Sequence, residues 1–423
     1  MTPVEEWIAE RRASTPYRVE RIPLPDIPNW RAVPGTGDLE HESGRFFAVR
    51  GLAAAFPDAP DDGWQQPILD QPEVGILGIL CRHTADGYDY LLHAKMEPGN
   101  SNLVQLSPTL QATFSNYTRV HRGRVPPYLD HFDGTRPAPA LTDSLQPETG
   151  TRFWQKRNRN VIIEVDPGLP VTAGFRWVSQ QELADLLLVD DLVNIDARSV
   201  LATLPRHEPR STAAAERAVA AVRAGLRVDR RVIPLADVAG WAADRDGIRH
   251  ETRNYFEVVG VRVAAADREV PSWGQPLLLH RGLGLAALFT RRDRGVHRYL
   301  FQVKFEAGNR RLTELAPTVS VFDYEARHGA GVDVPGLREF MDLPAEAVLL
   351  STVQSEVGGR FWNLRNRYVI AEVGDAGSVT ARGDFVWLSR AEAKSCLGGE
   401  YLVNSEARTL ILYTDLLEGA LDA

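Results

Sequence analysis

The second half of this chain repeats the first, and this repeat limits the possible folds more than any other feature. HESGRFFAVRG begins at His41 and HETRNYFEVVG begins at His250, while KMEPGN at Lys95 matches KFEAGN at Lys304. Two later pairs, RFWQKRNRN with RFWNLRNRY and FRWVSQQE with FVWLSRAE, keep nearly the same spacing. A spacing this constant through nearly the whole chain indicates tandem duplication of one domain.

The duplication predicts two domains, because 423 residues exceed what one ordinary hydrophobic core accommodates. We expect the repeats over 16–205 and 227–423, with a helical connector over 206–226 that contains the segment STAAAERAVAAVRAGL. Both repeats contain apolar runs separated by turn residues, and capping boxes at Ser179 and Ser389 predict helix starts. Each repeat is therefore predicted to be α+β, with an antiparallel or mixed β-sheet and flanking helices.

Composition excludes several classes of protein. The formal net charge of −8 disfavours nucleic-acid binding. No apolar run reaches the roughly 18 residues of a membrane span, and the N-terminal segment MTPVEEWIAERR lacks the apolar core of a secretion signal, so we expect a cytoplasmic protein. Cys81 and Cys396 are far apart, and no metal, nicotinamide, ATP or serine-hydrolase motif is present. The sequence therefore indicates no metal and no cofactor.

The stretch over 104–118, VQLSPTLQATFSNYT, is the most informative segment. If it is a strand, one face carries a row of neutral polar side chains: Gln105, Ser107, Thr109, Gln111, Thr113, Ser115 and Tyr117. Because that face has no Lys, Glu or Arg, the row favours a sugar or nucleotide pocket over a solvent-exposed face. Pro108 places the strand at an edge or interrupts it. The matching stretch over 313–322 loses the row, so we expect two different pockets, with the first better equipped.

Acidic residues near this stretch are further candidates. Lys95 and Glu97 share one strand face, and they either form a surface ion pair or contact a ligand. Asn100 either belongs only to the turn that follows or is a further ligand contact. Glu148 and Glu356 hold equivalent positions before an Arg-Phe-Trp segment. Each is either a general base or a structural acid paired with a nearby arginine.

Arginines of both repeats could bind a diphosphate through bidentate hydrogen bonds. The candidates are Arg119, Arg152, Arg157, Arg159, Arg360, Arg365 and Arg367. Solvent-exposed arginines in loops are the alternative interpretation.

Several of these segments resemble the motifs of NDP-hexose 2,3-dehydratases. They are HAKMEPGNSNLVQLSPTLQATFSNYTRVHRG, FWQKRNRNVIIEV and QSEVGGRFWNLRNRY. The resemblance covers nearly the whole chain and implies a duplicated Nudix-hydrolase-like fold, a homodimer and a nucleotide-sugar substrate of the dTDP-4-keto-6-deoxyglucose type. It also implies a separate 3-ketoreductase that receives the product. The Glu-rich Nudix signature is missing from both halves, which argues against pyrophosphate hydrolysis, and the second half has Glu306-Ala307-Gly308 where the family tends to have EPG.

The reaction that the resemblance implies needs neither a hydride nor a metal. The C3 proton of a 4-ketohexose is acidic, and its removal allows the C2 hydroxyl to leave as water. We hypothesise that Glu148 or Glu356 is the base and Tyr117 the acid. The sugar would contact Gln105, Ser107, Thr109 and Gln111, and the diphosphate Arg157 and Arg159 or Arg365 and Arg367. A non-catalytic nucleotide-sugar binding protein and a nucleotide-ketosugar isomerase or epimerase are the alternatives.

Overall fold

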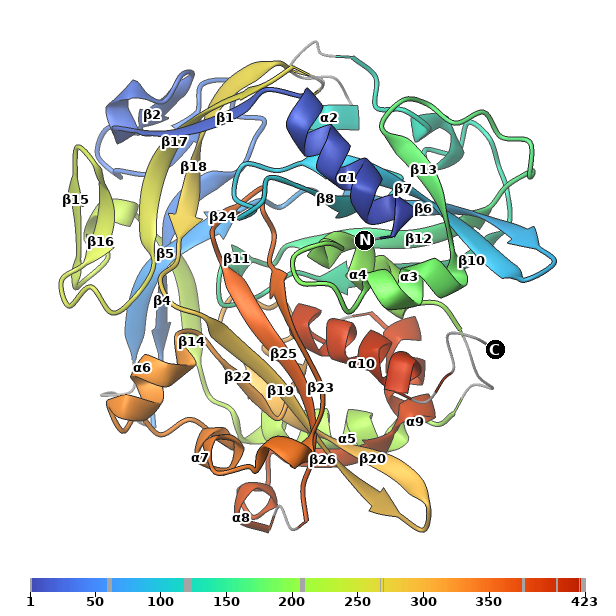
Figure 1. The fold of residues 1–423 in the computed structure, drawn as a ribbon. Coiled ribbons are helices and arrows are strands. Elements are labelled where there is room, and N and C mark those ends of the chain that lie inside the picture. Colours follow the sequence, from blue (N-terminus) through green and yellow to red (C-terminus); the bar gives the residue numbers. More distant parts are fainter. Residues whose placement is uncertain are drawn as a thin grey trace.

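A computed structural model gives the fold of the chain and describes residues 2–58, 63–117, 124–205, 210–266, 268, 270–374, 377–400, 402–417 and 419. Each repeat supplies one large and one small β-sheet, and helices lie between and around them (Figure 1). The two halves are similar and rich in sheet, as a duplication requires. The predicted combination of helices with a mixed sheet in each half is confirmed.

The large sheet of each repeat has seven strands among the described residues. In the first repeat the order is β10-β12-β6-β7-β13, with β8 on β7 and β9 on β6, and only β12 and β6 pair in parallel. These strands are β6 (Gly75–Thr84), β7 (Gly87–Met96), β8 (Val104–Ser107), β9 (Leu110–Ala112), β10 (Ala140–Pro147), β12 (Arg157–Glu164) and β13 (Phe175–Ser179). The second large sheet has the same order in β19 (Gly284–Asp293), β20 (Val296–Phe305), β21 (Thr313–Ala316), β22 (Val319–Val321), β23 (Val348–Ser355), β25 (Arg365–Glu372) and β26 (Phe385–Ser389).

The two small sheets exchange their first strands. The first contains β2 (Trp30–Ala32), β3 (Leu39–His41), β4 (Ala48–Ala55), β5 (Trp64–Asp70), β11 (Phe153–Trp154) and, from the second repeat, β14 (Asp229–Ile233). The second contains β15 (Trp241–Asp244), β16 (Gly247–His250), β17 (Glu257–Ala265), β18 (Ser272–Leu279), β24 (Phe361–Trp362) and, from the first repeat, β1 (Tyr17–Ile22). Figure 1 shows β1 beside β17 and β14 beside β4, both antiparallel. Each repeat therefore completes a sheet of the other.

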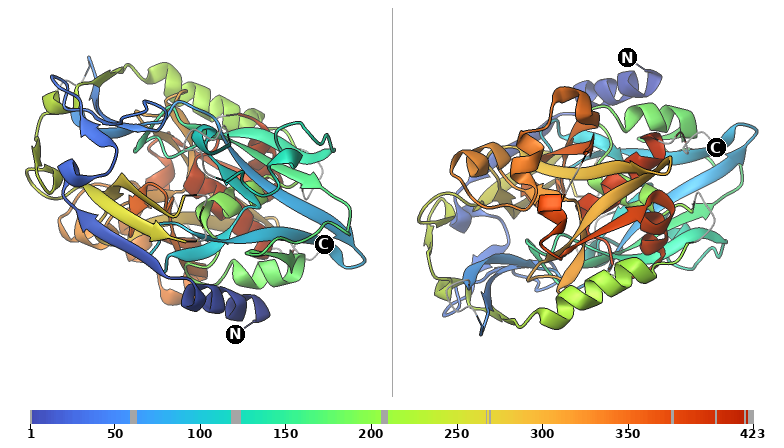
Figure 2. Two further views of the ribbon diagram at one scale, coloured as in Figure 1. Left: turned by 90° about the horizontal axis from the view of Figure 1, so that it is seen from above. Right: turned by 90° about the horizontal axis from the view of Figure 1, so that it is seen from below.

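Two helices join the large sheets. Helix α4 (Ile195–Ala202) contacts β6 and β12, α10 (Ser405–Leu417) contacts β19 and β25, and the two helices contact each other. The centre of the molecule is therefore layered as sheet, helix, helix, sheet, and Figure 2 shows these elements from two further directions. Because each helix has apolar side chains on both sides, one hydrophobic core runs through both repeats, from Leu77 and Val200 to Leu288 and Leu410.

Helices α1 (Pro3–Ser14) and α5 (Ala213–Gly225) hold equivalent places, since each directly precedes an exchanged strand. Arg12 of α1 donates to the carbonyl of Val104 at 2.7 Å, and Arg223 of α5 donates to that of Thr313 at 3.4 Å. The remaining α-helices are α2 (Phe114–Tyr117), α3 (Gln180–Leu186), α6 (Tyr324–Gly329), α7 (Leu337–Met341), α8 (Gly377–Thr380) and α9 (Arg390–Ser395). Among the described helices, none has the length and apolar character to cross a membrane.

Of the strand predicted over 104–118, the interruption considered at Pro108 is confirmed, the continuation past Thr113 is wrong, and residue 118 lies outside the described residues. The chain forms β8, leaves the ladder at Pro108, continues as β9 and turns into α2. Pro108 has no backbone N–H to donate, which accounts for the interruption. Because 114–117 is helical, the alternation of faces ends before Tyr117.

Candidate active site

A cavity of about 510 Å³ lies where the first large sheet meets the two small sheets. Its floor comes from the first repeat, and its walls come from both repeats. The residues that line the walls are Pro28, Asn29, Trp30, His41, Ser43, Phe46 and Phe47 of the first repeat and Arg268, Val270, Ser272, Trp273, Gly274, Gln275, Val357, Gly359 and Arg360 of the second. A volume of this size accommodates a small organic ligand. The cavity therefore depends on both repeats.

Strands β7 and β9 supply one side of the floor. Lys95, Glu97 and Gln111 line the cavity, and Ser107 contacts Gln111. Gln111 donates to Glu97 at 2.8 Å and accepts from the Ser107 hydroxyl at 2.5 Å, while Lys95 donates to the Gln111 carbonyl at 2.8 Å. Lys95 and Glu97 are both buried, so the surface ion pair considered for them is wrong. Thr113, directly after β9, also lines the cavity.

The turn after β7 holds this side of the floor against the second repeat. The N–H of Gly99 donates to the carbonyl of Gly358 at 2.7 Å, and the N–H of Asn363 donates to the carbonyl of Gly99 at 2.8 Å. A Cβ on Gly99 would collide with the carbonyl oxygen of Phe361. The glycine is therefore needed for the close approach of two backbones, beyond its role in a turn.

Glu148 lies on the opposite side of the floor, directly after β10. Its carboxylate accepts a hydrogen bond from Asn158 at 2.6 Å, and its backbone N–H donates to the carbonyl of Lys156 at 3.0 Å. Glu148, Lys156 and Asn158 all line the cavity. Burial raises the pKa of Glu148, against the opposing effects of the Arg408 and Lys156 cations. Burial lowers the pKa of Lys156 to about 8.

Asp196 is the third carboxyl group of the cavity, after Glu97 and Glu148, and comes from the first turn of α4. Asn194 caps this helix, since its side chain accepts from the N–H of Ala197 at 2.9 Å. Burial raises the pKa of Asp196 well above its usual range, and the neighbouring carboxylates of Glu148 and Glu97 raise it further. Of the three carboxyl groups that line the cavity, Glu148 and Asp196 both have raised pKa values, and neighbouring carboxylates add to the effect of burial only at Asp196.

The wall opposite this floor combines an arginine with aromatic rings. The guanidinium of Arg360 lies 4.0 Å from the ring centre of Phe47 and donates to Gln71 at 3.1 Å. Burial lowers the pKa of Arg360 to about 10. Trp30 donates through its indole N–H to the carbonyl of Gly274 at 3.0 Å, which fixes the rim to β18. The wall therefore presents a cation and flat apolar surfaces to a ligand.

The equivalent place in the second repeat is filled. His280 stands where the first site has Gln71, Phe322 replaces Thr113 and Leu364 replaces Lys156. Arg152, the counterpart of Arg360, lies 4.4 Å from the ring centre of Phe256 and 4.7 Å from that of Phe322, and it donates to His280 at 3.4 Å. A groove remains outside these packed side chains, and Trp241, His250 and Tyr255 are among its lining residues. The two places differ, as the sequence indicates.

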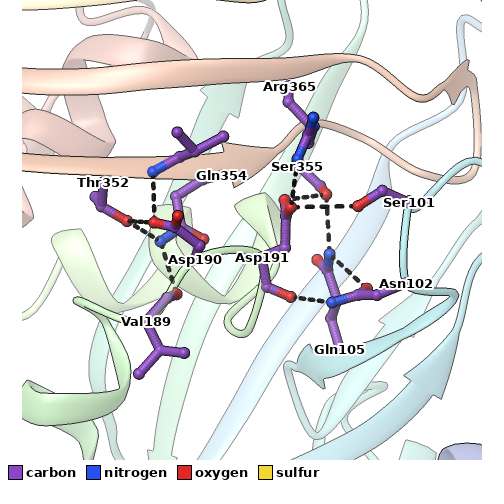
Figure 3. Close-up of polar contacts among 11 residues, drawn as sticks. Ser101, Asn102, Gln105, Val189, Asp190, Asp191, Thr352, Gln354, Ser355 and Arg365 are labelled. Atoms are coloured by element: carbon purple, nitrogen blue, oxygen red, sulfur yellow. Dashed lines mark hydrogen bonds and ion pairs between the residues drawn. The ribbon is translucent and has the colours of Figure 1, made fainter.

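Gln105 and Arg365, two of the candidate ligand contacts, instead join the repeats (Figure 3). Asp191 accepts from Ser355 at 2.5 Å and from Arg365 at 3.4 Å. Gln105 donates to Ser355 at 2.9 Å, and the neighbouring Asp190 accepts from the N–H of Val353 at 2.8 Å. These contacts fix the loop before α4 to β23 and so hold the start of the helix that carries Asp196.

Other candidates occupy structural positions. The Tyr117 hydroxyl donates to the carbonyl of Val74 at 3.3 Å, and its ring packs in an apolar cluster. Glu356 accepts from Asn366 at 3.0 Å and from Tyr368 at 2.6 Å. Thr109 accepts from the N–H of Leu80 at 2.9 Å, and Asn100 packs under Gly358. These four candidates are not among the described residues that line the cavity.

The arginines of the two Arg-Asn-Arg segments also lie outside the cavity lining. Arg159 binds Asp143 at 2.7 Å, Arg367 donates to Ser351 at 3.0 Å, and Arg157 is half-buried on the same face as Arg159. The alternation of β12 turns the asparagines, not the arginines, toward α4 and the cavity. Arg119 lies outside the described residues.

Sequence reasoning missed Gln71, Lys156, Asn158 and Asp196. Asn158 could have been found from the alternation of its strand, whereas Asp196 has no distinctive local pattern. Among the described residues, no group of His, Cys, Asp or Glu side chains is arranged to hold a metal ion.

The cavity joins buried acids, cations and an aromatic wall within a duplicated chain, and comparison with known proteins identifies its class. The family model for NDP-hexose 2,3-dehydratases matches residues 1–204 and again 212–413, so the chain belongs to this family. It is 41% identical over 426 residues to a dTDP-4-dehydro-6-deoxy-alpha-D-glucopyranose 2,3-dehydratase of Streptomyces violaceoruber, covering 96% of this chain and 95% of the relative. Relatives with the same name from Amycolatopsis orientalis and Saccharopolyspora spinosa are 39% and 37% identical, each over 96% of this chain and 88% and 89% of their own length.

Proposed function

We propose that the chain removes the C2 hydroxyl as water from a dTDP-linked 4-keto-6-deoxyhexose and gives a 3,4-diketo-2,6-dideoxyhexose. The names of the three relatives support the substrate, and family membership supports the class of reaction. The observation that carries the mechanism is that Glu148 and Asp196, two of the three buried carboxyl groups of the cavity, lie in it together. Paired carboxyls with different environments are a common arrangement for acid–base catalysis.

Glu148 is the proposed base and Asp196 the proposed acid. Glu148 takes the C3 proton, and the electrons of the C–H bond form an enolate whose charge rests on the C4 oxygen. When the C4 carbonyl reforms, a C2–C3 double bond forms and the C2–O bond breaks, and Asp196 protonates the departing hydroxyl. The resulting enol tautomerises to the 3,4-diketone. We prefer Asp196 to Tyr117 as the acid because Asp196 lines the cavity and its neutral form is favoured there.

Cationic side chains provide the remaining interactions. Lys95 and Lys156 line the floor and are the proposed donors to the enolate oxygen. Arg360 is the proposed diphosphate contact, since its guanidinium is held beside the cavity by Phe47 and Gln71. The aromatic wall near Trp30 is suited to stacking against the nucleotide base.

Further parts of the proposal rest on the family resemblance. Each repeat is a Nudix-like domain that has lost the carboxylate signature of pyrophosphate hydrolysis. Two copies of the chain form a homodimer in the cytoplasm, and a separate 3-ketoreductase consumes the reactive diketone.

Incubation of the protein with dTDP-4-keto-6-deoxyglucose tests the proposal directly. Dehydration lowers the mass of the sugar nucleotide by one water, whereas an isomerase or epimerase leaves the mass unchanged and a binding protein leaves the compound itself unchanged. Running the reaction in deuterium oxide and recovering unreacted substrate shows whether the C3 proton exchanges. Unchanged substrate with no exchange at C3 would refute the proposed function.

A further inference from the structure

Arg408 is a buried cation of the second repeat that lies behind the first-repeat floor of the cavity. It belongs to α10, and the residue is only 2% exposed. Its guanidinium donates to the carbonyl of Pro147 at 2.8 Å and to the hydroxyl of Ser199 at 2.8 Å. A third bond, at 2.9 Å, goes to the carbonyl of Val403 and fixes the arginine to its own repeat.

These contacts connect the two segments that carry the proposed acid and base. Pro147 immediately precedes Glu148, and Ser199 lies one helical turn after Asp196 on α4. Ser199 also accepts from Asn160 of β12 at 2.8 Å, so the helix, the strand and the arginine form one buried network. A shift of the Arg408 side chain would therefore move both carboxyl groups relative to each other.

The charge of Arg408 acts on the same pair. Around Glu148 the charged or titratable groups are Arg408 of α10, Lys156 before β12, Arg360 before β24, Asp196 of α4 and Glu356 after β23. Around Arg408 they are Glu148, Glu314 of β21, Glu406 of α10 and Asp196. Burial raises the pKa of Glu148, and Arg408 is the strongest influence that lowers it.

We propose that Arg408 is a positioning residue for the dehydration: it fixes the Glu148 and Asp196 segments together and places a buried positive charge behind them. The inference rests on the proposed function, because it assigns a purpose to a contact with the proposed base. It also places part of the machinery of the first-repeat site in the second repeat.

The chain contains a matched control. Arg198 is the equivalent residue of α4, is also fully buried, and donates to the carbonyl of Ser355 at 2.8 Å. Ser355 immediately precedes Glu356, so Arg198 contacts the backbone before Glu356 as Arg408 contacts the backbone before Glu148. Glu356 is not among the described residues of the cavity lining. A substitution at Arg198 therefore causes a similar disturbance in the core, and on the same helix as Asp196, without breaking a bond to the segment that carries the proposed base.

The experiment compares Arg408→Met with Arg198→Met in the full-length protein. The readouts are thermal melting, kcat, KM and the pH dependence of kcat/KM, whose acidic limb reports the ionisation of an essential base. We expect both variants to melt at lower temperature. Loss of the nearby positive charge should move the acidic limb of Arg408→Met upward by about one pH unit or more, while that of Arg198→Met stays at the wild-type position.

Arg408→Lys and Arg198→Lys decide the matter if the methionine variants do not fold. Lysine keeps the charge but cannot make the same set of bonds, so Arg408→Lys should lose about tenfold or more in kcat with little change in KM. Arg198→Lys should lose less of kcat than Arg408→Lys, because Arg198 makes no bond to the Glu148 segment. Equal acidic limbs and equal kcat values for the two positions would overturn the inference. An inactive wild-type protein would instead overturn the proposed function.

Discussion

Replacement of Glu148 by glutamine isolates its proposed role as the base. Glutamine has nearly the same shape, and its side-chain oxygen can still accept the 2.6 Å hydrogen bond from Asn158, so the floor of the cavity should persist. What is lost is the ability to take a proton. A positioned base contributes about 10²- to 10⁴-fold to a rate. Removing it should therefore raise the barrier by about 3 to 5 kcal/mol.

The assay measures water loss by mass spectrometry and C3 exchange by NMR in deuterium oxide, and both should fall together in Glu148→Gln. Glu356→Gln is the control, since Glu356 is buried between Asn366 and Tyr368 and is not among the described residues that line the cavity. Thermal melting shows whether each variant is folded. If Glu148→Gln dehydrates the substrate as fast as Glu356→Gln, or if its C3 exchange is unchanged, Glu148 is not the base.

Three further changes test other parts of the structure. Asp196→Asn should still exchange the C3 proton, which NMR follows, but the rate of water loss should fall about 10²-fold or more, because only departure of the hydroxyl needs the acid. Loss of the exchange would contradict this assignment. Gly99→Ala should lower the free energy of unfolding by more than about 2 kcal/mol in urea, because its Cβ collides with the Phe361 carbonyl. Burial raises the pKa of Glu406 to about 7 from 4.5, so the stability linked to its protonation is present below pH 4.5 and lost as the pH rises through 7. At pH 8 the free energy of unfolding of Glu406→Gln, measured in urea, should therefore exceed that of wild type by at most about 3 kcal/mol. The difference should shrink toward pH 4.5.

The fold could be predicted where the signal is local. The hairpin of β6 and β7, its copy in β19 and β20, and the capped starts of α3 and α9 follow from turn residues and capping boxes. The exchange of β1 and β14 could not be predicted, because an edge strand has the same pattern whichever sheet it joins. Only the contacts of the folded chain select the partner.

In the candidate site, too, the residues with a local signal could be predicted and those whose role depends on packing could not. Gln111 and Glu148 were found from residue type and local pattern, and both line the cavity. The Arg-Asn-Arg segment of β12 misled the assignment, because charge drew attention to Arg157 although alternation gives the inner face to Asn158. Asp196 resembles an ordinary acidic residue in the first turn of a helix, where it stabilises the helix dipole. Its role depends on where α4 packs, which no local pattern records.

The exchanged strands β1 and β14 limit how the gene of such a duplicated protein can evolve. After duplication, a copy whose pocket has closed is normally free to be deleted. Here deletion of the second half would remove strand β14 from the small sheet of the first half and a wall from its cavity. The second copy is therefore kept because the first copy needs its strand and its wall residues. The filled place in the second copy can mutate as long as that strand and that wall stay intact.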